Sequence, residues 1–313
     1  MNPSTRTRSA ALNIALSAYQ RDQHPLPGIE DEARRDSFVR QLLDSTRRTE
    51  YVGTMRKREL SASRSDPNNS LFDPILGAIV CHRAGEIEEA FWLAFLATHF
   101  GKALSSKWEL CRAVYGRLES GQVSSWDRTR TDTEELCSWI VSNAEQIKSG
   151  PPPRKFGNHR KYEPLIDKAK RGTPAAIRSY VGWIMTAGSH EKLVERAMRN
   201  SDNDPYLAFD QLYASMSAVV SFGRLARFDY LSMLGKLGLA PITAGSTYLS
   251  ASTGPLTGAA LLFFNSTTAS QPARVMDRSL RKLGEALQVT MQDLEDALCN
   301  WQKSPNTYRR FSG

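Results

Sequence analysis

The chain has 313 residues, of which 41% are hydrophobic, and its formal net charge is +8 at neutral pH. This length suits one large domain or two small ones, each with a real apolar core. The charge favours an anionic partner, nucleic acid first, although a basic protein without such a partner has the same composition. The four cysteines form no CxxC pair, which argues against a zinc site and against a disulfide-rich secreted domain.

The sequence shows neither a signal peptide nor an apolar run as long as a membrane span. We therefore expect a cytoplasmic monomer that has no membrane contacts, no bound metal and no cofactor. Alternating strand patterns and internal repeats are also missing from the sequence, which predicts an all-α architecture.

Helical patterns in the first half of the chain become strongly apolar. They cover residues 9–19, 29–49, 87–100, 107–118 and 134–147. In the third of them, apolar residues that include Trp92 recur at helical spacing, and Gly101 follows as a suitable C-cap. His99, near the end of this helix, is interpreted either as a cap or core polar group or as a contact to substrate.

Two basic segments flank the middle of the chain. Arg and Lys side chains crowd residues 47–64, where a solvated loop and a phosphate contact are both compatible with the pattern. Gly150 and the three prolines after it predict a linker, so we place a domain boundary there, between residues 1–150 and 151–313. Residues 154–171 then carry seven Lys or Arg with interleaved aromatic rings, which is typical of a nucleic-acid surface. The candidate DNA contacts in this segment are Arg154, Lys155, Asn158, His159, Arg160 and Lys161.

The second half adds helical patterns and a tight turn. These patterns cover residues 173–185, 190–200, 205–220, 279–287 and 290–303, with a further helix that opens at Gly254 and Pro255. The apolar run up to residue 220 breaks at Ser221-Phe222-Gly223, and a new helix starts at Arg224. Such a turn directs unpaired backbone N–H groups at the positive end of the second helix, where a phosphate binds. We expect Gly223, Arg224, Arg227 and Lys236, and Lys303 near the end of the chain, to contact DNA. A positive φ at Gly223 is compatible with this turn.

The last helix, 290–303, supplies the first candidate for a catalytic carboxylate. Met291, Leu294, Leu298 and Trp301 form one apolar stripe, with Glu295 and Gln302 on its flank. A carboxylate directed toward an apolar face is costly unless it is paired or used, and this favours Glu295. A structural glutamate bound to an amide or an arginine is the alternative. Asp296, Asn300 and Lys303 fall on the polar face of the helix.

Asp229 is the second candidate, on the helix that follows the tight turn. That helix is apolar nearly all round, and only Asp229, Ser232 and Lys236 share a narrow polar stripe. The stripe faces either a pocket or water. Asp296 is the third carboxylate to consider.

These segments resemble the α-glutamyl/putrescinyl thymine pyrophosphorylase families, relatives of the helix-hairpin-helix DNA glycosylases. The resemblance lies in residues 221–229, in Thr253-Gly254-Pro255 with Gly258, and in residues 295–303; residues 89–102 and 156–162 are similar to the third clade. It spans roughly residues 40–310 and implies a glycosylase-like fold of two helical subdomains around a cleft. The aspartate that opens the helix after the hairpin loop in those glycosylases is replaced here by Thr253-Gly254-Pro255, so its role does not transfer.

We consider three functions, the first two of which the resemblance implies. The leading hypothesis is a DNA glycosylase that flips a hypermodified pyrimidine out of double-stranded DNA and excises it, leaving an abasic site, with a role in antiviral defence. The alternative is a transferase in which an amine displaces pyrophosphate from an activated hydroxymethyl-pyrimidine. A non-catalytic DNA-binding protein is the third hypothesis. The base pocket is predicted to contain Trp92, His99, Asn300, Trp301 and Gln302.

Overall fold

The computed structural model describes residues 3–157, 163–168, 171–268 and 271–310, and within these ranges the regular elements are all helices. Extended pairing in the described part of the chain is limited to two isolated bridges, one of which joins Ala103 and Lys107. The prediction of an all-α protein is therefore confirmed.

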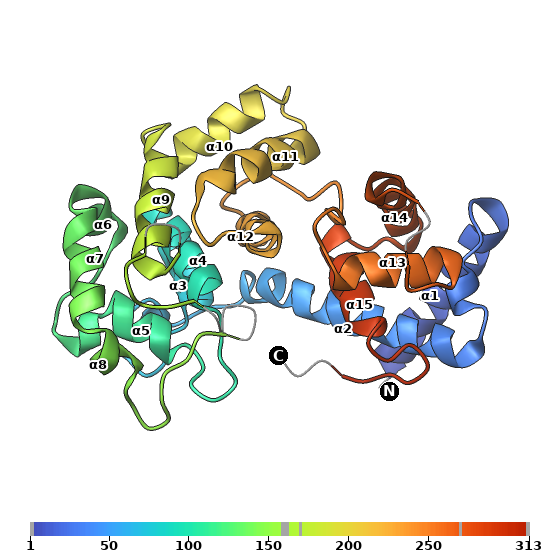
Figure 1. The fold of residues 1–313 in the computed structure, drawn as a ribbon, viewed down its shortest axis with the longest axis horizontal. Coiled ribbons are helices and arrows are strands. Elements are labelled where there is room, and N and C mark those ends of the chain that lie inside the picture. Colours follow the sequence, from blue (N-terminus) through green and yellow to red (C-terminus); the bar gives the residue numbers. More distant parts are fainter. Residues whose placement is uncertain (1–2, 158–162, 169–170, 269–270, 311–313) are drawn as a thin grey trace. The chain divides into compact units, whose positions relative to one another are not determined.

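The chain divides into two compact units (Figure 1). The terminal unit consists of Met1–Tyr51 and Ala244–Ser312, and the middle unit of Val52–Thr243. Helix α2 (Glu32–Met55) belongs mostly to the terminal unit and runs into the middle one. The boundary that we expected after residue 150 lies inside the middle unit. Proline-rich composition identifies an exposed connection, but it does not reveal that the two ends of the chain pack together.

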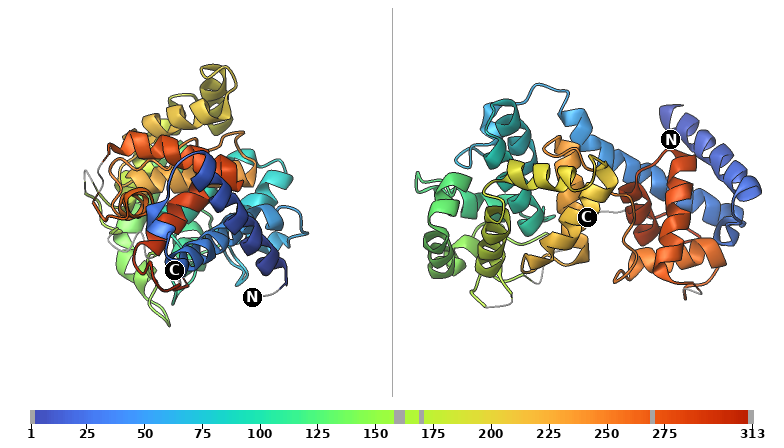
Figure 2. Two further views of the ribbon diagram at one scale, coloured as in Figure 1. Left: turned by 90° about the vertical axis from the view of Figure 1, so that its right-hand side faces the viewer. Right: turned by 90° about the horizontal axis from the view of Figure 1, so that it is seen from above.

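Five of the helices build the terminal unit, and Figure 2 shows the blue and red ends of the chain side by side in both views. They are α1 (Pro3–Asp22), α2, α13 (Gly254–Phe264), α14 (Ala273–Leu287) and α15 (Met291–Trp301), with the short 3₁₀ turn η1 (Pro27–Ile29). As predicted, α13 has Pro255 in its first turn, where the missing N–H costs nothing.

Glycines set the closest packing in the terminal unit. A Cβ at Gly258 of α13 would lie 2.5 Å from the carbonyl oxygen of Leu298 on α15, and one at Gly28 would lie 2.0 Å from that of Leu261. Only residues without a side chain allow these backbones to approach so closely. Trp301 fills the core beside them, with its ring edge-on to Phe38 at 5.2 Å between centroids.

The middle unit is built around α4. Its helices are α3 (Pro74–Arg83), α4 (Ile87–Phe100), α5 (Glu109–Tyr115), α6 (Trp126–Thr131), α7 (Thr133–Ser142), α8 (Ala144–Lys148), α9 (Thr173–Met185), α10 (His190–Arg199), α11 (Pro205–Ser215) and α12 (Arg224–Leu237), with 3₁₀ turns at Ala62–Arg64, Arg117–Glu119 and Met216–Ala218. Helix α4 is apolar on nearly every side and contacts α3, α5, α6, α10 and α12, which explains why its sequence lacks a polar face.

Two predicted helix ends in this unit are confirmed. Gly101 follows α4 with φ +65°, and its N–H donates to the carbonyl of Ala97 at 3.0 Å. The second helix of the predicted hairpin starts at Arg224, directly after the turn. The apolar run before that turn ends earlier as an α-helix, at Ser215, and continues as a 3₁₀ turn.

Candidate active site and DNA-binding hairpin

The turn between α11 and α12 has a backbone different from the one expected. Gly223 has φ −68° and ψ −171°, so the positive φ suggested for it is wrong; the left-handed residue is Ser221, with φ +64°. Among the described residues no side chain caps α12 at Gly223. Gly223 is exposed, and a Cβ there would meet nothing within 4 Å. At Gly223, therefore, the described residues leave space beside the start of α12, where helix amides favour an anion.

Arg227 is an ordered cation in the first two turns of α12. Its Nη1 donates to the carbonyl of Tyr213 at 3.0 Å, and its guanidinium carbon lies 4.4 Å from the centre of the Tyr213 ring. Its Nε is buried and has no hydrogen-bond partner within the described ranges. Arg224, one turn earlier, is half-buried. Near the end of the helix, the backbone carbonyl of Lys236 accepts a hydrogen bond from Arg56 Nη1 at 3.0 Å.

Two described parts of the basic segment contact the middle unit. At its start, the Gly157 N–H donates to the Phe100 carbonyl at 2.7 Å, and the Phe156 ring stacks on Phe100 at 5.5 Å. Further along, Glu163 Oε2 accepts a hydrogen bond from Ser221 Oγ at 2.9 Å. Residues 156–157 therefore lie beside the end of α4, and Glu163 lies beside the hairpin turn.

The DNA contacts predicted in this segment have different surroundings. Arg154 Nη1 donates to the carbonyls of Gln146, Ile147 and Ser149 at the end of α8, at 3.2, 3.3 and 2.6 Å. The side chain of Lys155 is exposed. Asn158, His159, Arg160 and Lys161 lie outside the described residues, so their roles stay predictions.

A polar network joins α15 to α2 in the terminal unit. Asp296 Oδ2 accepts from Arg48 Nη2 at 2.5 Å and from Ser45 Oγ at 2.8 Å. Asp296 Oδ1 accepts from Asn300 Nδ2 at 2.8 Å, and Asn300 Oδ1 accepts from Lys303 Nζ at 3.2 Å. The structure thus brings together three of the predicted site residues, and adds Arg48, which the sequence placed only in a basic segment. Asn300 is buried, although periodicity placed it on the polar face of the helix.

Glu295 lies next to this network and is 6% exposed. Asp293, on the preceding turn, is used structurally: its carboxylate accepts from the backbone and hydroxyl of Thr290, and Thr290 Oγ1 accepts from the Asp293 N–H. This capping box satisfies two amides at the start of α15. Gln302, at the other end of the helix, donates to the Cys299 carbonyl at 3.2 Å.

Asp229 and Ser232 occupy the polar stripe of α12 in the middle unit. Asp229 is half-buried. Ser232 Oγ is buried and has no hydrogen-bond partner among the residues that the structure describes. The polar stripe is therefore partly removed from water. Partial desolvation is what we expect of a stripe that faces a pocket.

The aromatic residues predicted for the base pocket fill cores in this structure. Trp92 and Trp301 are both fully buried, and Trp92 Nε1 donates to the Ser124 carbonyl at 2.7 Å. His99 is 1% exposed, and its Nε2 lies 3.0 Å from Thr173 Oγ1. Trp92 and His99 belong to the middle unit and Trp301 to the terminal unit. Their assignment to a base pocket stays a prediction.

Sequence reasoning missed a buried hydrogen-bond chain that ends on α12. Glu88 Oε2 lies 2.8 Å from His190 Nδ1, His190 Nε2 lies 2.7 Å from the Tyr180 hydroxyl, and that hydroxyl lies 2.7 Å from the hydroxyl of Tyr230. We call Glu88–His190–Tyr180–Tyr230 the relay. A carboxylate only accepts, so His190 donates from Nδ1, and its Nε2 accepts from Tyr180 when the ring is neutral. The four residues come from four helices, so no spacing in the sequence reveals them.

Burial controls the titration of the relay. It lowers the pKa of His190, an effect that the bond to Glu88 partly offsets. Burial would raise the pKa of Glu88, but hydrogen bonds from the His190 side chain and from two backbone amides outweigh it and bring this pKa below its usual value. Burial also raises the pKa of Tyr180 and Tyr230, so both hydroxyls remain protonated donors at neutral pH.

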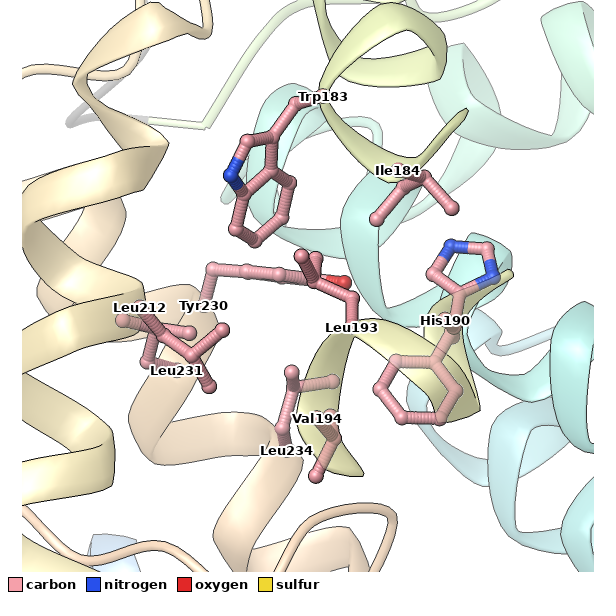
Figure 3. Close-up of a pocket in the computed structure, with 10 residues that line it drawn as sticks. Trp183, Ile184, His190, Leu193, Val194, Leu212, Tyr230, Leu231 and Leu234 are labelled. Carbon is pink, nitrogen blue, oxygen red and sulfur yellow. The ribbon is translucent and has the colours of Figure 1, made fainter. Parts of the chain in front are cut away.

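A small cavity adjoins the relay (Figure 3), where Tyr230 and His190 lie among apolar side chains such as Leu193 and Val194. Its volume is about 10 Å³, which is room for about one water molecule. This volume is too small for a nucleobase, and the relay contacts α12 through Tyr230.

No described helix is both long and apolar enough to cross a membrane. Within the described ranges, no group of three or more His, Cys, Asp or Glu side chains is arranged to hold a metal ion. No curated protein and no solved structure matches the chain significantly. The family model of the alpha-glutamyl/putrescinyl thymine pyrophosphorylases, clade 3, matches residues 33–313, and the chain therefore belongs to this family.

Proposed function

We propose that this protein is a DNA glycosylase-like enzyme that excises a modified thymine from double-stranded DNA and leaves an abasic site. The name of the family describes an enzyme of alpha-glutamyl or putrescinyl thymine, which supports a modified thymine as the base. The helix-hairpin-helix architecture, the DNA partner and a role in antiviral defence belong to the same proposal.

The single observation that carries the proposal is the hairpin before α12. Its exposed Gly223 leaves the start of a helix of 14 residues open to an anion, and Arg227 is held in place there by Tyr213. Backbone amides at a helix start and a fixed guanidinium together suit a DNA phosphate. The net charge of +8 supports a polyanionic partner of this kind.

Glu295 is the carboxylate that we propose for catalysis. Breaking the N-glycosidic bond develops positive charge on the sugar, and a carboxylate in a water-poor site stabilises this charge most effectively. Glu295 is the more buried of the two leading candidates and lies in the motif of residues 295–303. Asp293 takes part in the capping box with Thr290, and Asp296 pairs with Arg48.

The family name favours transfer chemistry as the second candidate function. In that reaction an amine attacks the methylene carbon of an activated hydroxymethyl-pyrimidine, the carbon–oxygen bond breaks and pyrophosphate leaves. The base remains attached to DNA, so the two reactions give different products.

The test uses duplexes that carry α-glutamyl thymine, putrescinyl thymine or a pyrophosphorylated hydroxymethyl-uracil, the last with and without glutamate or putrescine. Excision is scored as alkali-labile abasic sites and free base, and transfer as released pyrophosphate with a heavier base. We expect abasic sites from at least one modified thymine. Pyrophosphate release without abasic sites would replace the first proposal by the second, and neither product from any duplex would contradict both.

A further inference from the structure

A short loop follows the end of α4 in the middle unit and exposes one apolar side chain. Leu104, which lies in this loop between Ala103 and Lys107, is 63% exposed. Single exposed leucines are common on protein surfaces, and Leu71 and Leu207 in the same unit are 47% and 54% exposed. The surroundings of Leu104 are what distinguish it from these two. We call residues 102–107 the Leu104 loop.

The two ends of the Leu104 loop are held together. Ala103 and Lys107 exchange two backbone hydrogen bonds, at 3.0 and 2.9 Å, which close the loop. Ala103, Ser106 and Trp108 are buried, and Trp108 Nε1 donates to Asp73 Oδ2 at 2.8 Å. The backbone below the exposed leucine is therefore ordered before any partner binds. Insertion of this side chain into a partner costs little further conformational entropy.

Lysines surround the exposed leucine. Lys102 and Lys107 are exposed at the two ends of the loop. Lys155 of the basic segment is exposed as well, and its backbone N–H donates to Ser106 Oγ at 3.0 Å. Lys102 also lies near an acidic group, with its Nζ 4.0 Å from Asp73 Oδ2. An apolar tip among three cations suits a partner that combines negative charge with an apolar interior.

The Leu104 loop leaves the end of α4 at which the basic segment and the hairpin turn also lie. A Cβ at Gly157 would lie 2.9 Å from the Lys102 nitrogen, so the backbone of the basic segment lies against the loop. His99, in the last turn of α4, stacks on Phe222 of the hairpin turn, with 6.3 Å between ring centres.

The distance from the hairpin turn to Leu104 is short on the scale of DNA. Helix α4 ends at Phe100, four residues before Leu104, and four extended residues span at most about 14 Å. One turn of B-DNA is about 34 Å long. One duplex is therefore long enough to contact both the hairpin turn and the Leu104 loop.

We propose that Leu104 inserts into the base stack of DNA as an apolar wedge. This proposal rests on the proposed function, because both require DNA as the partner. An apolar side chain that enters the stack separates neighbouring bases and kinks the duplex. Turning a base out of the duplex costs stacking energy, and a leucine in the vacated space restores apolar contact there. Lys107 and Lys155 bind neighbouring phosphates and hold the tip against the duplex. Leu104 is thus a positioning residue that does not touch the reacting atoms.

A duplex that carries a tetrahydrofuran abasic analogue, with 2-aminopurine as the neighbouring base, tests this proposal. 2-Aminopurine fluoresces more strongly when it is unstacked, so it reports the separation of bases. The analogue represents a position without a base, and the test does not depend on which thymine is modified. The full chain is titrated into this duplex, and binding is followed separately by the anisotropy of a terminal dye. We expect saturable binding together with a rise in 2-aminopurine fluorescence.

Variants assign the rise to Leu104. Leu104→Ala should abolish it and weaken binding by at most about tenfold, since phosphate contacts supply most of the affinity. Leu104→Met, which keeps a long apolar side chain, should restore the rise. Leu207→Ala is the matched control, because Leu207 is similarly exposed on α11 but lies near Asp204 and Asp210 in the sequence. This control should bind and fluoresce as the unchanged protein does.

The possible failures are distinguishable. A full rise with Leu104→Ala, or binding of the unchanged protein without any rise, would overturn the wedge and leave the proposed function as it is. No binding of the duplex by the unchanged protein would instead overturn the DNA partner, and both proposals would fall with it.

Discussion

Helices α12 and α15 each present a candidate catalytic carboxylate, but they are held in place by opposite kinds of interaction. Helix α15 is bound to α2 through permanent charges at the edge of the protein: the side chains of Arg48 and Asp296 are 35% and 28% exposed. Helix α12 carries Tyr230, whose hydroxyl belongs to the relay; in the relay His190, Tyr180 and Tyr230 are buried, and only Glu88 at its far end is partly exposed.

This difference predicts different sensitivities for the two helices. Charges in contact with water are screened by salt and change little with pH near neutrality. Hydrogen bonds between buried hydroxyls and a neutral imidazole do not depend on salt concentration, but protonation of the imidazole in acid weakens them. Whether α12 or α15 carries the chemistry can be tested at the two carboxylates, and how each helix is fixed can be tested by changing the networks behind them.

The largest expected effect concerns the carboxylates themselves. Glu295→Gln keeps the shape of the side chain and removes its charge, so base release should slow by about 10²-fold or more, as for loss of one electrostatic contact to a transition state. Asp229→Asn is the matched change on α12 and should have the smaller effect, because Asp229 is only half-buried. Single-turnover rates on saturating DNA measure both.

Far-UV circular dichroism and DNA affinity are the controls for these two variants, and both should match the unchanged protein. A loss of rate confined to Asp229→Asn would move the catalytic role to α12. Wild-type rates in both variants would exclude the two residues and leave Asp296 as the carboxylate to test.

The second largest effect is on the free energy of unfolding, and it tests how the relay stabilises α12. Tyr180→Phe removes the hydroxyl shared by His190 and Tyr230, and leaves both groups buried without that partner. We expect the free energy of unfolding to fall by about 2 kcal/mol. Tyr19→Phe is the control, because Tyr19 makes one hydrogen bond, to the Ser279 carbonyl at 3.2 Å, and should cost less than about 1 kcal/mol. Equal urea midpoints for the two variants would show that the relay adds nothing.

The sequence predicted local structure better than it predicted the partners of each helix. Apolar spacing and Gly101 located α4, and the break at Ser221 located the hairpin, because these signals lie within one turn of the residues that they fix. A positive φ was considered possible at Gly223, but the left-handed residue is Ser221. The error arose because glycine tolerates a positive φ without requiring one.

Long-range contacts explain what sequence reasoning missed at the candidate site. Periodicity marked one face of α15 as polar, but not that Arg48, 248 residues earlier, would cover it. Glu88 and His190 are 102 residues apart, and neither position stands out in its own helix. Pairing of this kind depends on which helices pack together, and a single sequence does not encode it in its spacing.

The next, smaller effect is the pH dependence of the free energy of unfolding, which should come from the α12 side. The pKa of His190 lies below the unfolded value of about 6.5, so the unfolded state binds more protons as the pH falls through that value, and the folded state loses stability. The pKa of Glu88 is also lowered, so its contribution disappears at still lower pH. We expect a slope of at most about 1.4 kcal/mol per pH unit below pH 6.5, which should flatten in His190→Gln. A slope that persists in this variant would implicate another group.

The smallest effect tests the α15 side, where a half-exposed ion pair should contribute at most about 1 kcal/mol. Asp296→Asn removes the charge that faces Arg48 but retains an oxygen for Ser45 and a side chain of the same size. We expect a small loss of stability at low salt that vanishes near 1 M salt, where the screening length falls to about 3 Å. Tyr180→Phe should keep its full effect at both salt concentrations. Urea midpoints at the two concentrations measure the difference, with Arg8→Gln as a control because its pair with Glu50 is still more exposed. If the loss in Asp296→Asn does not depend on salt, hydrogen bonds rather than charge hold α15, and the two helices are fixed in the same way.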